Sequence, residues 1–133
     1  PVDMAAEQRN GNFVRELITE SRVDTCHDLS DGGLLVAAAE MAMAGDIGLE
    51  LSGPDEAGYW FGEDQGRYLI AVPAGEAAEI LQKAAQAQVP AEKLGRSGGG
   101  TLTLNAGAPI SLSELRRTHE AWLPDFMRND LHE

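Results

Sequence analysis

The sequence predicts a mixed α/β fold of the α+β type, in which helices cover a mixed sheet. Three observations lead to this expectation. Segments with helical periodicity alternate with short extended segments along the whole chain, which places helices beside a sheet. Glycine, proline and polar residues separate these segments, as turns do. Finally, 43% of the residues are hydrophobic and 24% are charged, a composition that supports a buried core and is not typical of disorder.

The first part of the chain alternates between the two patterns. Apolar side chains recur on one helical face over residues 12–21, and a short extended run follows over residues 23–29. Residues 34–44 are rich in Ala, Leu and Met and contain no proline or glycine, which predicts a helix. Residues 47–51 then alternate between apolar and polar side chains as a strand does. Residues 52–58 have the glycine and proline of a loop.

The middle of the chain contains the most apolar extended segment. Residues 59–66 are ambiguous, although we expect Trp60 and Phe61 to be buried and the residues after them to form a turn. Residues 67–72 are apolar on both faces, which is typical of a central strand in a covered sheet. They therefore predict the centre of the sheet.

The last third continues the alternation. Residues 74–88 form an amphipathic helix by their spacing, residues 91–96 are a weak strand, and residues 101–105 are a better one. We interpret residues 97–100 as a flexible hairpin loop between these two strands.

A capping motif predicts the start of the final helix. Ser111 is followed three residues later by Glu114, so that each side chain can accept a hydrogen bond from an unpaired backbone N–H. Pro124 predicts a kink or a stop in this helix, and residues 127–133 are expected to be a polar tail.

Charge and length limit the function. The chain has 133 residues, with 10 Lys and Arg against 22 Asp and Glu, a formal charge of −12. This balance argues against a nucleic-acid partner and against docking on an anionic membrane, since both need a clustered basic face. A domain typically has about 150 residues. Because the chain starts at Pro1, we interpret residues 1–133 as a single domain excised from a larger, multidomain subunit.

The cellular location follows from cysteine use and hydropathy. Cys26 is the only cysteine, so an intramolecular disulfide and a cysteine-built zinc site are excluded. The sequence has no apolar run near the ~20 residues of a membrane span and no signal peptide. These features predict a reducing, cytoplasmic location.

The segment most suggestive of chemistry is the turn between the second and third predicted elements. Asp28, Ser30, Asp31, Gly32 and Gly33 lie between an extended run and a helix. A helix start presents unpaired N–H groups that suit a phosphate, and two glycines let a ligand approach the backbone. The two carboxylates would repel a phosphate unless Mg²⁺ lay between them. The alternative is purely structural: Ser30 or Asp31 caps the helix, and the glycines allow close packing.

A second polar segment precedes the apolar strand. It offers Glu63, Asp64 and Arg67 within the sequence Gly-Glu-Asp-Gln-Gly-Arg. One interpretation places a carboxylate on Mg²⁺ and uses Arg67 to bind an anion in a bidentate manner. The other pairs Arg67 with Glu63 or Asp64 across a tight turn.

Other candidate residues indicate little chemistry. His27, His119 and His132 are far apart in the sequence and lack the spacing of metal ligands, so we predict no metal site and expect His27 to form a local hydrogen bond. Cys26 is interpreted as a buried structural thiol. These histidines and Cys26 therefore give no catalytic candidate, and a family resemblance described below implies that this chain has no catalytic residue.

Two motifs together resemble a known family. They are His27–Leu34 (His-Asp-Leu-Ser-Asp-Gly-Gly-Leu), followed by Ala39–Ala42, and Phe61–Arg67 (Phe-Gly-Glu-Asp-Gln-Gly-Arg). In this order they resemble the large subunit of phosphoribosylformylglycinamidine synthase, over about residues 13–127. Residues 111–116 are also similar to the carboxyl terminus of that family. The wider superfamily contains aminoimidazole ribonucleotide synthetase.

The resemblance implies both a fold and an activity. The fold would be the C-terminal domain type of the aminoimidazole ribonucleotide synthetase-like superfamily, in the second of two repeats. The activity would be that of an ATP-dependent C–N ligase of purine biosynthesis, which uses ATP and Mg²⁺ in the full-length enzyme to form an amidine with glutamine-derived ammonia. The implied partners are the remaining domains of the subunit, a glutaminase subunit and a small accessory subunit. Alone, the chain is expected to be inactive, with no certain cofactor.

The resemblance also bears on the residues. It supports a phosphate- or nucleotide-facing role for the turn Asp28–Gly33 and for Arg67, in a duplicate pocket whose nucleotide is not turned over. We further expect an apolar face around Leu35, Ile70 and Val72 that is covered in the complete subunit and allows the isolated chain to self-associate. Two alternatives stay open: a small-molecule kinase or synthetase domain of the same superfamily, and a stand-alone interaction module.

Overall fold

The computed structural model describes residues 3–129, which form two compact units. Unit 1 consists of residues up to 38 together with residues 54–93, and unit 2 consists of residues 39–53 and the residues from 94 onward. The predicted mixed α/β composition is confirmed. The elements in chain order are α1 (Met4–Thr19), β1 (Thr25–Asp28), α2 (Gly33–Gly45), β2 (Leu49–Leu51), α3 (Ala57–Phe61), β3 (Tyr68–Ala71), α4 (Ala77–Gln86), β4 (Gly95–Ser97), β5 (Thr101–Leu104), β6 (Ile110–Ser111) and α5 (Leu112–Asn129).

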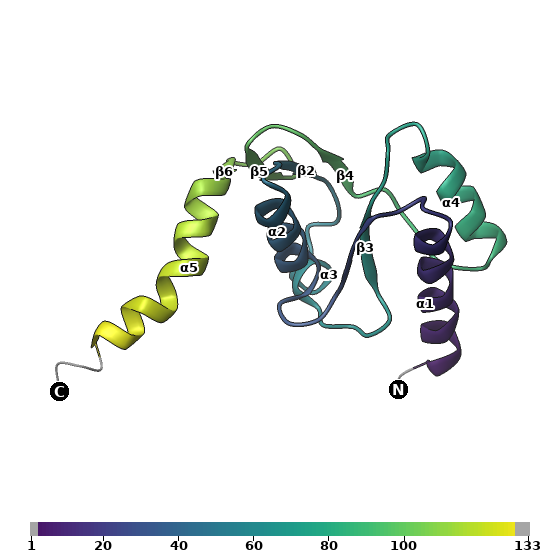
Figure 1. The fold of residues 1–133 in the computed structure, drawn as a ribbon, viewed down its shortest axis with the longest axis horizontal. Coiled ribbons are helices and arrows are strands. Elements are labelled where there is room, and N and C mark those ends of the chain that lie inside the picture. The colour runs from purple at the N-terminus through teal and green to yellow at the C-terminus, as the bar shows by residue number, and fades with distance from the viewer. Residues whose placement is uncertain (1–2, 130–133) are drawn as a thin grey trace. The chain divides into compact units, whose positions relative to one another are not determined.

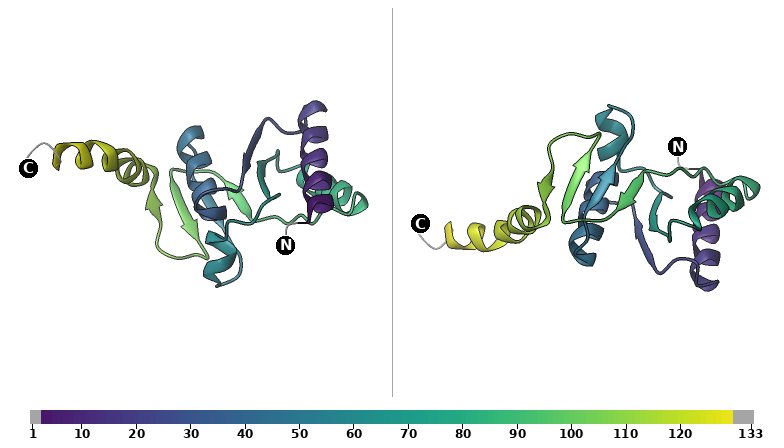
Figure 2. Two further views of the ribbon diagram at one scale, coloured as in Figure 1. Left: turned by 90° about the horizontal axis from the view of Figure 1, so that it is seen from below. Right: turned by 90° about the horizontal axis from the view of Figure 1, so that it is seen from above.

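Unit 1 is built on a two-stranded antiparallel ribbon that packs against two helices. β1 pairs with β3 in a register that places Cys26 opposite Ile70. Helices α1 and α4 lie side by side in both views (Figures 1 and 2). Ile70 and Val72 pack against a cluster of buried side chains that comes mainly from these helices. That cluster consists of Phe13, Leu17, Val23, Ile80, Ala84 and Val89.

Among the residues whose burial the structure describes, Leu17 is the largest side chain that is almost completely buried, with 1% exposure. Truncating a core leucine removes its transfer free energy and leaves a cavity. We therefore expect Leu17→Ala to lower the free energy of unfolding by about 2–5 kcal/mol in urea titrations. Ile18→Ala, which truncates the neighbouring side chain on the same helix at 48% exposure, should change it by less than about 1 kcal/mol. Equal losses in the two variants would contradict the placement of this core.

The strand predicted to be central has only one strand partner among the described residues. β3 pairs with β1, and its side chains are exposed or half-buried, with Tyr68 at 39% exposure. The predicted cover on both faces is therefore wrong, because an unbroken apolar run suits a covered strand but reveals neither its actual burial nor how many strands lie beside it. Ile70 and Val72 are partly buried where they pack against the core cluster of unit 1, so they contribute less to the free apolar face that the sequence suggested.

Unit 2 contains a four-stranded mixed sheet in the order β4-β2-β5-β6. β2 is antiparallel to β4 and parallel to β5, and β5 is antiparallel to β6. The predicted hairpin over residues 97–100 is therefore wrong, since β2 lies between the two strands that this loop connects. Gly48, just before β2, binds the segment that connects β4 to β5. Its N–H donates to Gly99 O and its C=O accepts from Gly98 N–H, both at 2.8 Å.

Helix boundaries differ from the predictions at several ends. α1 begins at Met4, eight residues before the predicted start, because Asp3 caps it by accepting hydrogen bonds from the N–H groups of Ala5 and Ala6. α3 was not predicted at all; in it Trp60 is buried as expected, but Phe61 is 54% exposed, so its predicted burial is wrong.

The final helix begins as predicted and runs further than predicted. Ser111 Oγ accepts a hydrogen bond from Glu114 N–H at 3.1 Å, which confirms one half of the capping motif. α5 continues through Pro124 to Asn129, so the loss of one N–H donor does not stop it, and residues 127–129 of the predicted tail are helical. Residues 130–133 of that tail lie outside the described part of the chain. Over residues 3–129, no helix combines the length and apolarity needed to cross a membrane.

Candidate functional site

The two polar segments that the sequence suggested separately lie next to each other in unit 1. The antiparallel register of β1 and β3 places Asp28 opposite Tyr68, so the turn after β1 meets the loop before β3. Leu29 N–H extends this pairing by donating to Arg67 O at 3.0 Å. The candidate site is therefore built from residues 28–33 and 61–67.

A carboxylate from the loop binds the backbone of the turn. Gly32 N–H donates to Glu63 Oε1 at 2.9 Å, and Gly33 N–H donates to Ser30 O at 3.1 Å. Among the hydrogen bonds of the described residues, none joins the side chain of Ser30 or Asp31 to the start of α2. Glu63, 31 positions away in the sequence, thus binds the N–H of the residue that precedes α2, and not an N–H of its first turn.

Gly33 brings the turn and the loop into close contact. Its φ is +72°, and an added Cβ would lie 2.6 Å from the carbonyl carbon of Phe61 and 2.8 Å from Gly62 O. The space that a side chain would need is therefore filled by the end of α3. At Gly32, with φ +82°, an added Cβ would instead meet a side chain, with Val36 Cγ2 at 2.6 Å. The close approach at Gly33 agrees with the packing part of the structural alternative considered from the sequence, but not with its cap by Ser30 or Asp31.

Arg67 contacts an acid and an aromatic ring. Its Nη1 lies 3.5 Å from Asp64 Oδ2, which confirms the pairing with Asp64 among the two acids considered. Its guanidinium carbon is 5.9 Å from the centroid of the Tyr59 ring. The side chains of Arg67 and Asp64 are 30% and 78% exposed, so the ion pair is open to solvent and to a ligand.

The loop is also attached to α1. Asn10 Nδ2 donates to Gly66 O at 3.1 Å, while Asn10 Oδ1 is buried without a hydrogen-bond partner. Gly66 has φ +71°, and an added Cβ there would lie 2.7 Å from Glu7 Cγ. Beside this attachment is a depression of about 510 Å³, lined by Asp3, Ala6, Glu7, Asn10, Glu63, Asp64 and Gln65.

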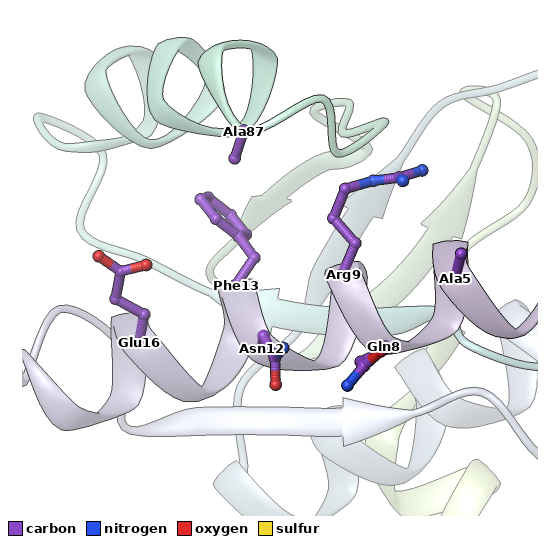
Figure 3. Close-up of a pocket in the computed structure, with 7 residues that line it drawn as sticks. All are labelled: Ala5, Gln8, Arg9, Asn12, Phe13, Glu16 and Ala87. Carbon is purple, nitrogen blue, oxygen red and sulfur yellow. The ribbon is translucent and has the colours of Figure 1, made fainter.

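A second depression of unit 1 lies between α1 and the end of α4. Its volume is about 490 Å³. Figure 3 shows Phe13 directed from α1 toward Ala87. The six residues predicted to bind a phosphate line neither of these depressions; they are Asp28, Ser30, Asp31, Gly32, Gly33 and Arg67.

Negative charge dominates the candidate site. Four carboxylates, those of Asp28, Asp31, Glu63 and Asp64, accompany the single cation of Arg67. Within residues 3–129, no group of three or more His, Cys, Asp or Glu side chains is arranged to hold a metal ion. To bind at this site, a phosphate would therefore have to carry a bound cation that offsets the repulsion, or to displace one of the carboxylates.

The two residues before the turn, His27 and Cys26, do not point to catalysis. His27 Nδ1 lies 2.6 Å from Asp28 O, which confirms the predicted local hydrogen bond. Cys26 is exposed, so its predicted burial is wrong. Partial desolvation of its thiol, and then the charge of Asp28, raise the pKa of Cys26, which disfavours the nucleophilic thiolate.

Sequence reasoning missed Tyr59, which lies beside Arg67, and Glu92, which binds the Tyr59 hydroxyl. Tyr59 lies on the unpredicted helix α3, and Glu92 lies in the segment after α4; the Tyr59 hydroxyl donates a hydrogen bond to Glu92 Oε1. The sequence did contain one indication. A tyrosine and a tryptophan stand shortly before the loop of residues 62–66, and buried rings of this kind usually find a hydrogen-bond partner.

The chain matches one protein-family model. Residues 1–105 match the family described as AIR synthase related protein, C-terminal domain.

Curated relatives are similar over almost the whole chain. The phosphoribosylformylglycinamidine synthase subunit PurL of Azorhizobium caulinodans is 50% identical over 131 residues, and that of Rhodospirillum rubrum is 52% identical over 129 residues. Each alignment covers 96% of this chain but only 18% and 17% of the respective relative. The chain therefore spans less than a fifth of the length of these relatives.

Solved structures show the same fold. The structure of Thermotoga maritima PurL complexed with FGAR has a TM-score of 0.73 at 20% identity, covering 85% of this chain and 21% of that one. The complex of the same protein with ATP has a TM-score of 0.69 at 18% identity, covering 80% and 21%. The resemblance inferred from the two motifs is thus confirmed, and the chain belongs to the family of AIR synthase related proteins, C-terminal domain.

Proposed function

We propose that this chain serves as a domain of phosphoribosylformylglycinamidine synthase in purine biosynthesis. The main support is its identity of about half to PurL subunits over 96% of its length. In the complete enzyme, formylglycinamide ribonucleotide, ATP and glutamine-derived ammonia would yield formylglycinamidine ribonucleotide. The proposed enzyme is an ATP-dependent C–N ligase of the cytoplasm, and the isolated chain would be inactive.

The proposed partners are the other domains of the same subunit, a glutaminase subunit and a small accessory subunit. The structure of PurLQS from Thermotoga maritima, whose matched chain has a TM-score of 0.72, supports an assembly of this kind. The chain would supply a pocket wall and an interface between domains. Its formal charge of −12 gives no support to a nucleic-acid or membrane partner.

A chimera tests the proposed function. The aligned 129 residues of the Rhodospirillum rubrum PurL subunit are replaced by this chain, and the hybrid is expressed in a bacterium that lacks PurL. We expect growth without added purine, whereas the same PurL with the segment deleted should not support growth. A hybrid that is produced at full length and remains soluble but fails to support growth would contradict the proposal.

Within this function, we propose that Asp28–Gly33 and Arg67 face a phosphate. The support is the hydrogen bond from Gly32 N–H to Glu63, because it shows that this amide is directed at an anionic oxygen. A phosphate would replace Glu63 there, with Arg67 and the Ser30 hydroxyl as further donors. Asp28 and Asp31 fit Mg²⁺ by their oxygen chemistry. Mg²⁺ is usually bound by one or two carboxylates together with substrate phosphates. We therefore expect these two acids to bind Mg²⁺ only when a nucleotide supplies the remaining ligands.

Glu63→Ala tests whether the carboxylate and a phosphate compete for the turn. Removing the internal anion should tighten the binding of ADP with Mg²⁺ by about two- to tenfold, the equivalent of one hydrogen bond. Isothermal titration calorimetry on the 133-residue chain measures this change. Glu56→Ala is the matched control, because Glu56 is an exposed carboxylate at the start of α3 that makes no capping bond. Absence of binding by both wild type and Glu63→Ala would overturn the phosphate proposal.

A further inference from the structure

Arg67 is the single cation of the candidate site, and its contacts come from three directions. Its backbone carbonyl accepts from Leu29 N–H at 3.0 Å, which fixes the start of β3 beside the turn. Its guanidinium pairs with Asp64 and lies over the Tyr59 ring. The ion pair with Asp64 has the length of a loose surface contact, and such pairs alone restrict a side chain weakly.

Tyr59, in contrast, is held firmly. Its hydroxyl donates to Glu92, and its ring meets that of Trp60 edge-on, with centroids 5.0 Å apart. Trp60 is 3% exposed, and its Nε1 donates to Pro54 O at 2.8 Å. The Tyr59 ring is thus held by its contact with the buried Trp60 and by the hydrogen bond from its hydroxyl to Glu92, which lies in a separate segment.

We infer that Tyr59, anchored by Glu92 and Trp60, is a positioning residue that orients the Arg67 guanidinium for anion recognition. This inference rests on the proposed phosphate site, to which it adds a residue. The planar face of arginine stacks on an aromatic ring while its edge stays free to donate hydrogen bonds. Tyr59 therefore supports one face of Arg67 and leaves the N–H edge available to an anion.

The state of the phenol fits this role. Partial burial, and then the hydrogen bond to Glu92, raise the pKa of Tyr59 to about 12, while the charge of Arg67 opposes the shift. The phenol accordingly stays protonated and continues to donate to Glu92 at neutral pH.

Side-chain NMR signals of Arg67 test the geometry. In the 133-residue chain, the ring current of Tyr59 should shift the guanidinium signals of Arg67, assigned with Arg67→Lys. We expect Tyr59→Leu to abolish the shift, because it removes the ring. Tyr59→Phe should retain part of the shift, because the ring stays but its hydrogen bond to Glu92 is lost. Tyr68→Phe is the matched control, since this exposed tyrosine follows Arg67 directly and should leave the shift unchanged.

Calorimetry with ADP and Mg²⁺ tests the consequence. The loss of a cation–π contact corresponds to about a two- to fivefold weaker affinity. We expect this loss in Tyr59→Leu, a smaller loss in Glu92→Gln, and no additional loss when Tyr59→Leu is combined with Arg67→Gln. Circular dichroism checks that each variant is folded. If Tyr59→Leu does not fold, Glu92→Gln still tests the inference.

The outcomes separate this inference from the function on which it rests. Unshifted Arg67 signals in the wild type, or signals that do not respond to Tyr59→Leu, overturn the positioning role. Unchanged affinity of Tyr59→Leu in a chain that binds the nucleotide overturns it as well. If neither the wild type nor Glu63→Ala binds the nucleotide, but the Arg67 shift depends on Tyr59, the phosphate site is overturned and the orientation of Arg67 by Tyr59 is supported.

Discussion

Gly95→Ala is expected to destabilise the protein by about 3 kcal/mol or more. Gly95 lies opposite Leu51 in the antiparallel pair of β4 and β2. A Cβ at position 95 would overlap the carbonyl oxygen of Glu50 and lie 2.8 Å from its carbonyl carbon. Both atoms belong to the backbone of a paired strand, so the conflict cannot be relieved by rotating a side chain and the strands must separate.

Urea unfolding followed by circular dichroism measures this loss. Gly100→Ala is the matched control, because Gly100 lies in the segment that joins β4 to β5 and an added Cβ there meets no atom within 4 Å. We expect the control to stay within about 0.5 kcal/mol of wild type. Similar stabilities of Gly95→Ala and Gly100→Ala would contradict the close approach of β4 to β2.

Gly33→Ala is expected to cost about 2–5 kcal/mol, from two sources that add. The left-handed backbone at φ +72° strains any residue with a Cβ, and that Cβ would collide with the backbone of Phe61 and Gly62. The collision would push the end of α3 away from the turn. It should therefore also break the hydrogen bond between Gly32 and Glu63.

Gly99→Ala separates the two sources. Gly99 has nearly the same backbone angle, φ +68°, but an added Cβ there meets nothing within 4 Å. Its cost should be the strain alone, about 1–2 kcal/mol. Thermal or urea unfolding of both variants gives the difference, which measures the packing of the turn on α3. A difference near zero would show that this packing contributes nothing to stability.

Part of the candidate site could be predicted from the sequence because its signals are local. The turn before α2 is evident from two adjacent glycines followed by helix-forming residues, and Ser111 with Glu114 marks the start of α5 within four positions. The local hydrogen bond of His27 follows from its neighbour in the chain. Each of these features depends on residues that are close in sequence.

The remainder of the site could not be predicted, because its contacts join residues that are far apart in sequence. Nothing near Gly32 indicates that its N–H donates to Glu63, and nothing near Tyr59 indicates that its hydroxyl reaches Glu92. α3 has only five residues, too few for a helical period to be recognised against loop residues such as Gly58.

The sequence by itself determined the alternation of helices and strands, the turn and loop motifs, and the family to which they belong. The tertiary structure alone decided that β2 separates β4 from β5, that β3 has a single partner within the described residues, and that Gly33 accommodates the backbone of Phe61. The physical reason is the range of the interactions. Propensity and capping act within one or two turns of chain, whereas strand order and close backbone packing are fixed only when distant segments bury their apolar faces together.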